Sequence, residues 1–176
     1  MTTRTAHARL DGEALRLIAT TGSGHRIVMD DAGGDSGPRP AELLMVAQAG
    51  CTAMDVASIL RKKRQPFRRY DVQVTGEQRD DRYPHVFEQL RIVHLVEGDV
   101  DVADVRRAIE LSATRYCTVT ANLASGVARI HHAYVVRHTS GAEEHGEVVV
   151  TGPHQGPDAG GERVAAGYSQ AADMRA

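Results

Sequence analysis

Aromatic residues are scarce in this chain, which has no tryptophan, five tyrosines and two phenylalanines among 176 residues. Proteins that bind single-stranded nucleic acid stack bases on aromatic side chains, so this scarcity argues against such a surface. An excess of one charge is also missing, since 21 Lys and Arg stand against 23 Asp and Glu. We therefore expect neither nucleic acid nor an anionic membrane among the partners.

Long apolar runs are absent as well. No stretch reaches the roughly 18 consecutive apolar residues of a membrane helix, and the first ten residues, MTTRTAHARL, contain no apolar signal core. The length suits one domain with a hydrophobic core and a tail. We expect a soluble protein of the cytoplasm that does not enter a membrane.

Cysteine occurs only twice, at Cys51 and Cys117. No CxxC or Cys/His spacing typical of structural zinc is present, and the neighbours His131 and His132 would face opposite sides of a strand. We therefore expect no metal and no cofactor. In a reducing compartment the two cysteines are either unrelated buried thiols or a redox pair.

The most regular apolar pattern covers residues 39–65, RPAELLMVAQAGCTAMDVASILRKKRQ. Apolar and small residues recur at positions 44, 47, 51, 54 and 58, the spacing of one helix face, and Cys51 lies on that face. Pro40 suits the first turn and Pro66 ends the run. The opposite side is also apolar, which is typical of a buried helix. Because one chain is too small to cover it, we predict an obligate homodimer with the long helices at its centre.

Shorter elements are predicted on both sides of this helix. Before it, two alternating segments form a hairpin with the Gly-rich turn TGSGH at its tip. After it come two strands that can pair antiparallel, an amphipathic helix with an aspartate N-cap, a short helical segment that begins near Cys117 and ends at Gly126, and a last strand. The predicted ranges are 13–20, 26–30, 70–75, 90–96, 102–111, 115–125 and 127–137.

The composition changes after residue 137, where Gly, Glu, Ala and His dominate. We predict one domain over residues 1–137 and a largely disordered C-terminal extension over residues 138–176. Strands grouped between helices, without strict βαβ alternation, indicate an α+β fold with antiparallel sheet.

Two motifs, RPAELLMVAQAGCTAMDV around Cys51 and SATRYCTVTANL around Cys117, resemble the OsmC/Ohr family. Within it they are similar to the YhfA-like branch, whose members carry SPMELLLMALGGCTxxDV and KYCSVSAML at these places. The resemblance covers residues 12–134. It implies an OsmC-like fold, in which antiparallel sheets wrap around long central helices in an intertwined homodimer with an active site at each subunit interface.

The resemblance also implies a chemistry. In the characterised members one cysteine reduces an organic hydroperoxide and becomes a sulfenic acid, a second cysteine converts it into a disulfide, and an external dithiol reduces that disulfide. Carried over to this chain, Cys51 is the peroxidatic residue and Cys117 the resolving one. Thiol chemistry agrees, because the attacking species is a thiolate and a resolving thiol protects the sulfenic acid from further oxidation.

An attacking thiol with an ordinary pKa near about 8.5 needs a helix N-terminus or a cation nearby. In the characterised peroxidases, a glutamate ten residues before the first cysteine and an arginine of the N-terminal hairpin orient the thiolate. Here the first of these positions is Ala41. Glu42 is one residue further on, about 100° around the helix, and His25 and Arg26 are the hairpin residues that could supply the cation.

Asp55 follows Cys51 by four residues and therefore lies one turn along the same face. A charged carboxylate there would raise the thiol pKa, so we expect it to have a structural partner such as an arginine. The basic residues at 61–64, 68 and 69 are interpreted as a solvated helix end, where cations interact favourably with the helix dipole.

A non-enzymatic function remains as the alternative. In that interpretation the protein is a dimer that binds a small apolar ligand between its subunits, and the cysteines only pack, as buried free cysteines often do. The distance between the two sulfur atoms across the dimer distinguishes the two hypotheses, because a disulfide requires the Cα atoms to lie within about 7 Å.

Overall fold

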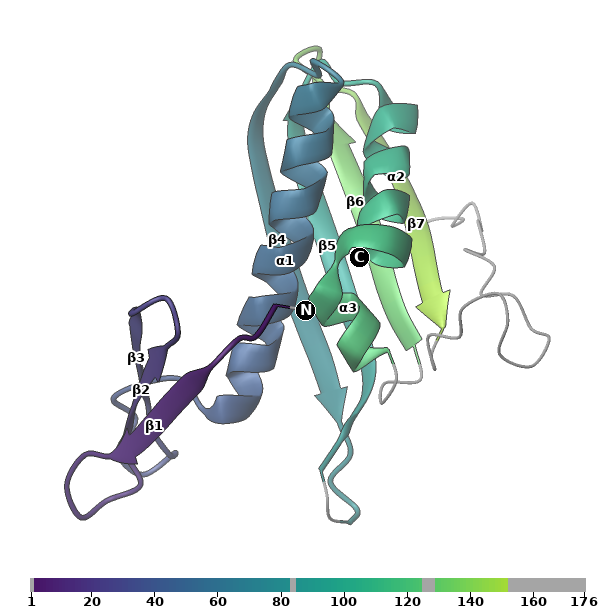
Figure 1. Cartoon of the computed structure of the whole chain (residues 1–176). Coiled ribbons are helices and arrows are strands. Elements are labelled where there is room, and N and C mark those ends of the chain that lie inside the picture. Colours follow the sequence, from purple (N-terminus) through teal and green to yellow (C-terminus); the bar gives the residue numbers. More distant parts are fainter. Residues whose placement is uncertain (1, 83–84, 125–128, 152–176) are drawn as a thin grey trace. The chain divides into compact units, whose positions relative to one another are not determined.

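The computed structural model describes residues 2–82, 85–124 and 129–151. The chain divides into two compact units, residues 1–46 and residues 47–176. Figure 1 shows the ribbon, with the first unit in purple and dark blue.

The first unit contains a three-stranded antiparallel sheet in the order β1-β2-β3. The predicted hairpin is confirmed as β2 and β3, with Gly24 in the left-handed region at φ 86° in the turn. Strand β1 was not predicted, although its segment alternates Ala6, Ala8 and Leu10 with His7 and Arg9; all five of its residues are exposed. The strands are β1 (Ala6–Leu10), β2 (Leu17–Thr21) and β3 (Arg26–Met29).

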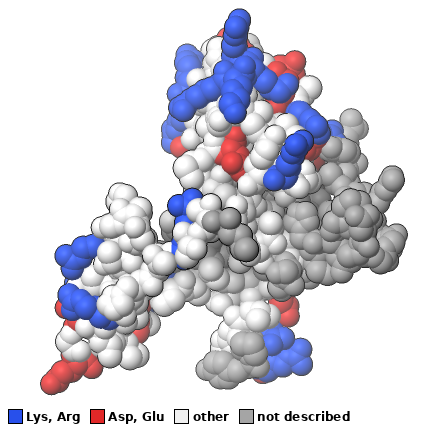
Figure 2. Space-filling view, viewed as in Figure 1, with Lys and Arg blue, Asp and Glu red and all other residues white. Residues whose placement is uncertain are grey.

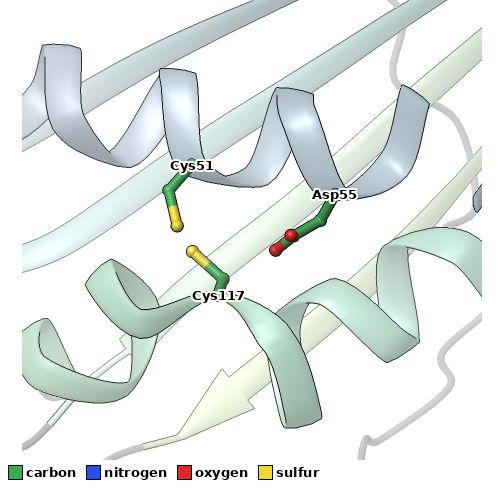
Figure 3. Close-up of side chains that lie close together, drawn as sticks. All are labelled: Cys51, Asp55 and Cys117. Atoms are coloured by element: carbon green, nitrogen blue, oxygen red, sulfur yellow. The ribbon is translucent and has the colours of Figure 1, made fainter. Parts of the chain in front are cut away.

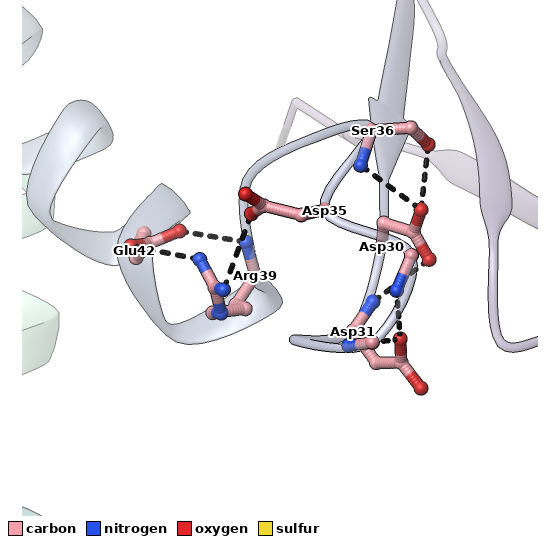
Figure 4. A network of polar contacts seen from close by, with 8 residues as sticks. Asp30, Asp31, Asp35, Ser36, Arg39 and Glu42 are labelled. Carbon is pink, nitrogen blue, oxygen red and sulfur yellow. Dashed lines mark hydrogen bonds and ion pairs between the residues drawn. The ribbon is translucent and has the colours of Figure 1, made fainter.

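A polar loop leads from β3 to the long helix α1 (Pro40–Lys62) (Figure 4). The Asp30 carboxylate accepts hydrogen bonds from the backbone N–H of Ser36 at 3.1 Å and from its hydroxyl at 2.6 Å. At the start of the helix the N–H of Arg39 donates to Oε2 of Glu42 at 2.8 Å. A glutamate in the first turn that caps the preceding N–H fixes where a helix begins, so Glu42 is a capping residue.

The second unit contains a four-stranded sheet in the order β4-β5-β6-β7, covered on one face by helices (Figure 1). Val56 and Leu60 of α1 share the hydrophobic core with Val96 of the sheet and Ile109 of α2. A π-helical turn, η1, joins α2 to the short helix α3. The elements are β4 (Phe67–Gln78), β5 (Phe87–Gly98), α2 (Val102–Leu111), η1 (Ser112–Tyr116), α3 (Thr118–Leu123), β6 (Arg129–Arg137) and β7 (Glu143–Thr151).

The α+β class predicted from the sequence is confirmed, although one of the pairings in this sheet is parallel. Strand β4 pairs antiparallel with β5, as predicted, whereas β5 pairs parallel with β6. The chain between β5 and β6 passes through α2, η1 and α3, and a helical crossover of this kind returns the chain in the same direction.

The predicted disordered extension over residues 138–176 is wrong for its first part. Residues 143–151 form β7, which pairs antiparallel with β6, and Val148 is fully buried in the core. The VVV run therefore belongs to the folded sheet because its alternation places Val148 on the inner face. Residues 152–176 lie outside the described residues, as does the predicted helix stop Gly126.

Helix α1 is confirmed, and within the single chain it packs through one side, whereas the sequence predicts a helix that a homodimer buries on every side. The buried residues are Gln48, Thr52, Val56 and Leu60. Met54, on the apolar face that also carries Cys51, is 71% exposed. Helix α1 is long and apolar enough to cross a membrane, a property that it shares with core helices of soluble proteins.

The basic run at the end of α1 is exposed, as predicted. Figure 2 shows Lys and Arg gathered at the top of the view, over the end of α1 and the start of β4. Lys63 pairs with Asp104 at 2.6 Å and Arg69 with Asp71 at 2.7 Å. This surface is a solvated helix end with local ion pairs.

Candidate active site

The two cysteines meet within a single chain (Figure 3). The sulfur atoms of Cys51 and Cys117 and a carboxylate oxygen of Asp55 all lie within 4.8 Å of one another. We call these three residues the thiol cluster. Both cysteines are free; Cys117 is buried and Cys51 is half-buried. An S–S bond is about 2.0 Å long, so the sulfurs would have to approach by less than about 3 Å.

Helix α1 presents the first two members of the thiol cluster, since Cys51 and Asp55 are four residues apart. An adjacent row of the same helix carries Gln48 and Thr52, which are buried polar residues. Nε2 of Gln48 donates to the Thr120 hydroxyl at 2.9 Å, and the Thr52 hydroxyl lies 3.1 Å from that of Ser112. Because buried polar groups need partners, these bonds hold α1 in register with the segment that carries Cys117.

The π-helical turn η1 places Cys117 opposite α1. Its last bond joins the N–H of Cys117 to the carbonyl of Ser112 at 2.9 Å, after which Cys117 acts as the N-cap of α3. The cysteine Sγ accepts a hydrogen bond from the N–H of Thr120 at 3.3 Å. The predicted position of Cys117 near a helix start is confirmed. The wide turn was not predicted, although such turns are frequent at functional sites.

Burial raises the pKa of Cys117 to about 11, with a further increase from the neighbouring Cys51 and an opposing effect of the hydrogen bond from Thr120. Cys117 is therefore a neutral thiol at neutral pH. Burial also raises the pKa of Asp55 above its ordinary value of 3.8, against the effect of the hydrogen bond from Ser112.

Asp55 is held by serine rather than by the predicted arginine. Oγ of Ser112 donates to Oδ2 of Asp55 at 3.0 Å. Because the Ser112 proton is used in this bond, Thr52 is the donor to Ser112. The prediction of an arginine partner is wrong within the described part of the chain. Sequence reasoning missed both Ser112 and Thr52. The only signal for Thr52 was a polar residue within the apolar helix α1, and Ser112, which lies in η1, gave no signal.

The other predicted site residues lie in the first unit. His25 is exposed in the β2–β3 turn, where its Nδ1 is 3.0 Å from the hydroxyl of Ser23. Arg26 is exposed at the start of β3, and Glu42 caps α1. The structure brings Cys51, Asp55 and Cys117 together, while the roles predicted for His25, Arg26 and Glu42 stay predictions.

Two surface pockets adjoin the thiol cluster. One, of about 380 Å³, is lined by residues of η1 and α3 together with Cys117. The other, of about 500 Å³, includes Asp55, Ile59, Leu111 and Tyr116, with Lys62 at its wall. Small molecules with an apolar part thus have space beside both the thiol of Cys117 and the carboxylate of Asp55.

Comparison with known proteins gives a consistent assignment. The family model described as OsmC-like protein matches residues 33–131. Protein YhfA of Escherichia coli K12 is 40% identical over 125 residues, which are 70% of this chain and 92% of YhfA.

Solved structures share the fold. A hypothetical protein from Aquifex aeolicus VF5 is 27% identical with a TM-score of 0.70, over 78% of this chain and 98% of that one. The organic hydroperoxide resistance protein OhrB of Bacillus subtilis has a TM-score of 0.52 at 15% identity, over 72% of this chain and 93% of that one, a likeness of fold alone. The match of the family model and the identity to YhfA agree with both cysteine motifs: this chain belongs to the OsmC-like protein family.

Proposed function

We propose that this protein reduces organic hydroperoxides with a pair of cysteines and is regenerated by an external dithiol. The observation that carries the proposal is the thiol cluster, in which the sulfurs of Cys51 and Cys117 lie within 4.8 Å of each other in one chain. The fold shared with a protein named for organic hydroperoxide resistance supports the same chemistry.

The exposure of the two cysteines supports the roles that we propose for them. Cys51 is half-buried and Cys117 is buried, so a peroxide in solvent has easier access to Cys51. The Cys51 thiolate attacks one peroxide oxygen, the O–O bond breaks, and the products are a sulfenic acid on Cys51 and an alkoxide that takes up a proton to become the alcohol. Cys117 then attacks the sulfenic sulfur, the S–O bond breaks, water leaves and the disulfide forms. A dithiol returns two electrons and two protons.

The second step needs a base, because the raised pKa of Cys117 keeps it protonated. Asp55 is the carboxylate within reach of both sulfurs. In our proposal it accepts the Cys117 proton and donates it to the leaving hydroxide, which makes it a general base and then a general acid. The hydrogen bond from Ser112 orients the carboxylate for both transfers.

The first step needs a positive charge near the attacking thiolate, and Ala41 stands where the family peroxidases carry a glutamate. We propose that His25 or Arg26 of the β2–β3 hairpin supplies this charge, with Glu42 retained as the cap of α1. If the variant His25→Gln turned over peroxide at the wild-type rate, His25 would have no part in activation.

The test is a thiol-coupled assay with cumene hydroperoxide on the wild type, Cys51→Ser and Cys117→Ser. Cys51→Ser should lose peroxide consumption. Cys117→Ser should consume about one equivalent and accumulate a sulfenic acid that dimedone traps. Equal activity in all three proteins would remove the enzyme proposal and favour the alternative, a dimer that binds a small apolar ligand. The observation in its favour is a pocket of about 700 Å³ lined in part by Ala53, Met54 and Tyr70.

We also propose that the protein is a cytoplasmic homodimer. The support for the dimer is the apolar surface that α1 leaves uncovered in the single chain, where Met54 is 71% exposed. A second copy that packs on α1 would bury this surface.

A further inference from the structure

The thiol cluster has the composition and spacing of a metal site. Three donor atoms, two sulfurs and one carboxylate oxygen, come from α1 and from the N-cap of α3 and lie within 4.8 Å of one another. In tetrahedral zinc sites the Zn–S distance is about 2.3 Å and the Zn–O distance about 2.1 Å, which places neighbouring sulfurs about 3.8 Å apart. The three side chains therefore need to close by only about 1 Å to hold one ion.

Two of the three side chains are already oriented by hydrogen bonds to groups outside the cluster. The N–H of Thr120 donates to Sγ of Cys117, a bond that stabilises a thiolate. The Ser112 hydroxyl donates a hydrogen bond to Oδ2 of Asp55 at 3.0 Å. Outer hydrogen bonds of this kind are what fix the ligands in protein metal centres.

We propose that the reduced protein binds one Zn²⁺ per chain through Cys51, Asp55 and Cys117, with the fourth position open to water. Two thiolates and a carboxylate suit a borderline ion such as Zn²⁺, whereas Mg²⁺ and Ca²⁺ require oxygen ligands throughout. The ion displaces one proton from each thiol, and two thiolates with one carboxylate offset its charge. Half-buried Cys51 provides the route of entry.

Binding at this site depends on the redox state of the cysteines. A disulfide between Cys51 and Cys117 has no thiolate to offer, so oxidation releases the ion and reduction restores the site. Bound Zn²⁺ occupies the sulfurs that the proposed peroxidase reaction uses, and thus protects them from peroxide. Three protein ligands and an open position are typical of accessible sites, so we expect an exchangeable ion and a fold that is stable without it.

Cobalt provides the direct test, because Co²⁺ in a tetrahedral thiolate site has intense visible bands and a sulfur-to-metal charge-transfer band. Reduced full-length protein is titrated with CoCl₂ without oxygen, and ZnCl₂ is then added. We expect saturation at one Co²⁺ per chain, loss of the bands when Zn²⁺ replaces it, and release of about two protons in weak buffer.

Variants identify the ligands. Cys51→Ser and Cys117→Ser should each weaken binding and lower the charge-transfer band, because one of the two thiolates is lost, and Asp55→Asn should weaken binding about 10- to 100-fold. Asp80→Asn, in an exposed loop, is the matched control and should bind as the wild type does. Absence of tetrahedral bands, binding that survives disulfide formation, or undiminished binding by Cys51→Ser would each overturn the site.

The metal titration contains no peroxide, so its result is independent of turnover. A peroxidase that binds no Co²⁺ would refute the metal site and leave the proposed function in place. A protein that binds Co²⁺ through both cysteines and does not consume peroxide would refute the proposed function alone. In a protein that does both, stoichiometric Zn²⁺ should stop peroxide consumption and a chelator should restore it.

Discussion

The surroundings of Asp55 favour a reactive cysteine pair over two cysteines that only pack. It lies beside both sulfurs, burial raises its pKa, and Ser112 rather than a cation holds it. A carboxylate without a permanent counter-charge can take and return a proton during one reaction cycle.

We predict that Asp55→Asn slows disulfide formation about 100-fold, because asparagine keeps a side-chain oxygen for Ser112 and cannot accept the proton of Cys117. The attack of Cys51 on peroxide should change little. Rapid-quench trapping of thiols and sulfenic acid after one equivalent of cumene hydroperoxide separates the two steps, with Asp80→Asn as the control.

The pH dependence of the same step provides a second readout. Asp55 must be ionised to act as the base, so the rate should rise with pH through a pKa above 3.8. This rise of the rate with pH should disappear in Asp55→Asn. If the rise persists in the variant, another group accepts the proton.

A second set of buried titratable residues lies in the core of the sheet. The Tyr70 hydroxyl is 2.6 Å from Nδ1 of His94, and Nε2 of His94 is 3.1 Å from Nδ1 of His132. Both histidines are fully buried, and Nε2 of His132 has no hydrogen-bond partner among the described residues. Burial lowers the pKa of both, that of His132 to about 3. The two rings are therefore neutral in the folded protein.

These histidines predict a loss of stability in acid. The folded pKa values lie below the unfolded value of 6.5, so the unfolded chain takes up protons first as the pH falls. Stability is complete above pH 6.5 and decreases from there towards pH 3, by about 1.4 kcal/mol per pH unit for each histidine that stays neutral. Urea unfolding at pH 7.5 and pH 5 measures the slope. His132→Leu should reduce it, half-exposed His145→Gln should not, and equal slopes in all three proteins would contradict the assignment.

Among the helices and strands, the sequence predicts the ones that a local pattern of apolar residues determines. Helix α1 is bounded by two prolines and has a clear apolar period, and strands β4 and β5 alternate. The buried face of α1 was not predictable in this way. Its two buried polar residues, Gln48 and Thr52, hydrogen-bond to Thr120 and Ser112, which are 72 and 60 residues away, and Oε1 of Gln48 has no partner among the described residues.

The candidate site likewise has a part that the sequence predicts and a part that depends on packing. The pairing of Cys51 with Cys117 was predicted from two motifs that resemble a family, and no local pattern of either segment contains it. The wide turn η1 and the serine that holds Asp55 depend on packing between α1 and the chain after α2, so residue spacing gives no signal for them. Composition near residue 138 also failed to reveal β7, because a single VVV run is too short to stand out.

Strand β7 allows a test of where the folded domain ends. A chain that stops at Arg137 loses all pairing on one edge of β6 and the buried side chain of Val148, which alone contributes about 1.5–3 kcal/mol. We expect this chain to be insoluble or to unfold without cooperativity. A chain that stops at Thr151 keeps every described strand pair and serves as the matched control. If the two chains have equal melting temperatures, measured by circular dichroism, the folded domain ends at residue 137.

For the whole molecule, the exposed apolar residues of α1 indicate how the protein assembles. In the second unit the helix packs through one side, while Met54 is 71% exposed. In the first unit Val46 of the same helix is 62% exposed. Exposed large apolar side chains are costly to leave in water, and a symmetric pair of such helices would remove them from solvent in both subunits at once.

We therefore predict a dimer at micromolar concentration that Met54→Asp dissociates. A buried methionine contributes about 1.5–3 kcal/mol, and two symmetric charges in the interface add repulsion, so the dissociation constant should rise at least about 100-fold. Sedimentation equilibrium on the wild type and the variant measures it. Val86→Asp, which changes a 39% exposed apolar residue in a loop, is the matched control and should remain dimeric. A monomeric wild type, or a Met54→Asp variant as tightly dimeric as the control, would show that α1 is not at the centre of the assembly.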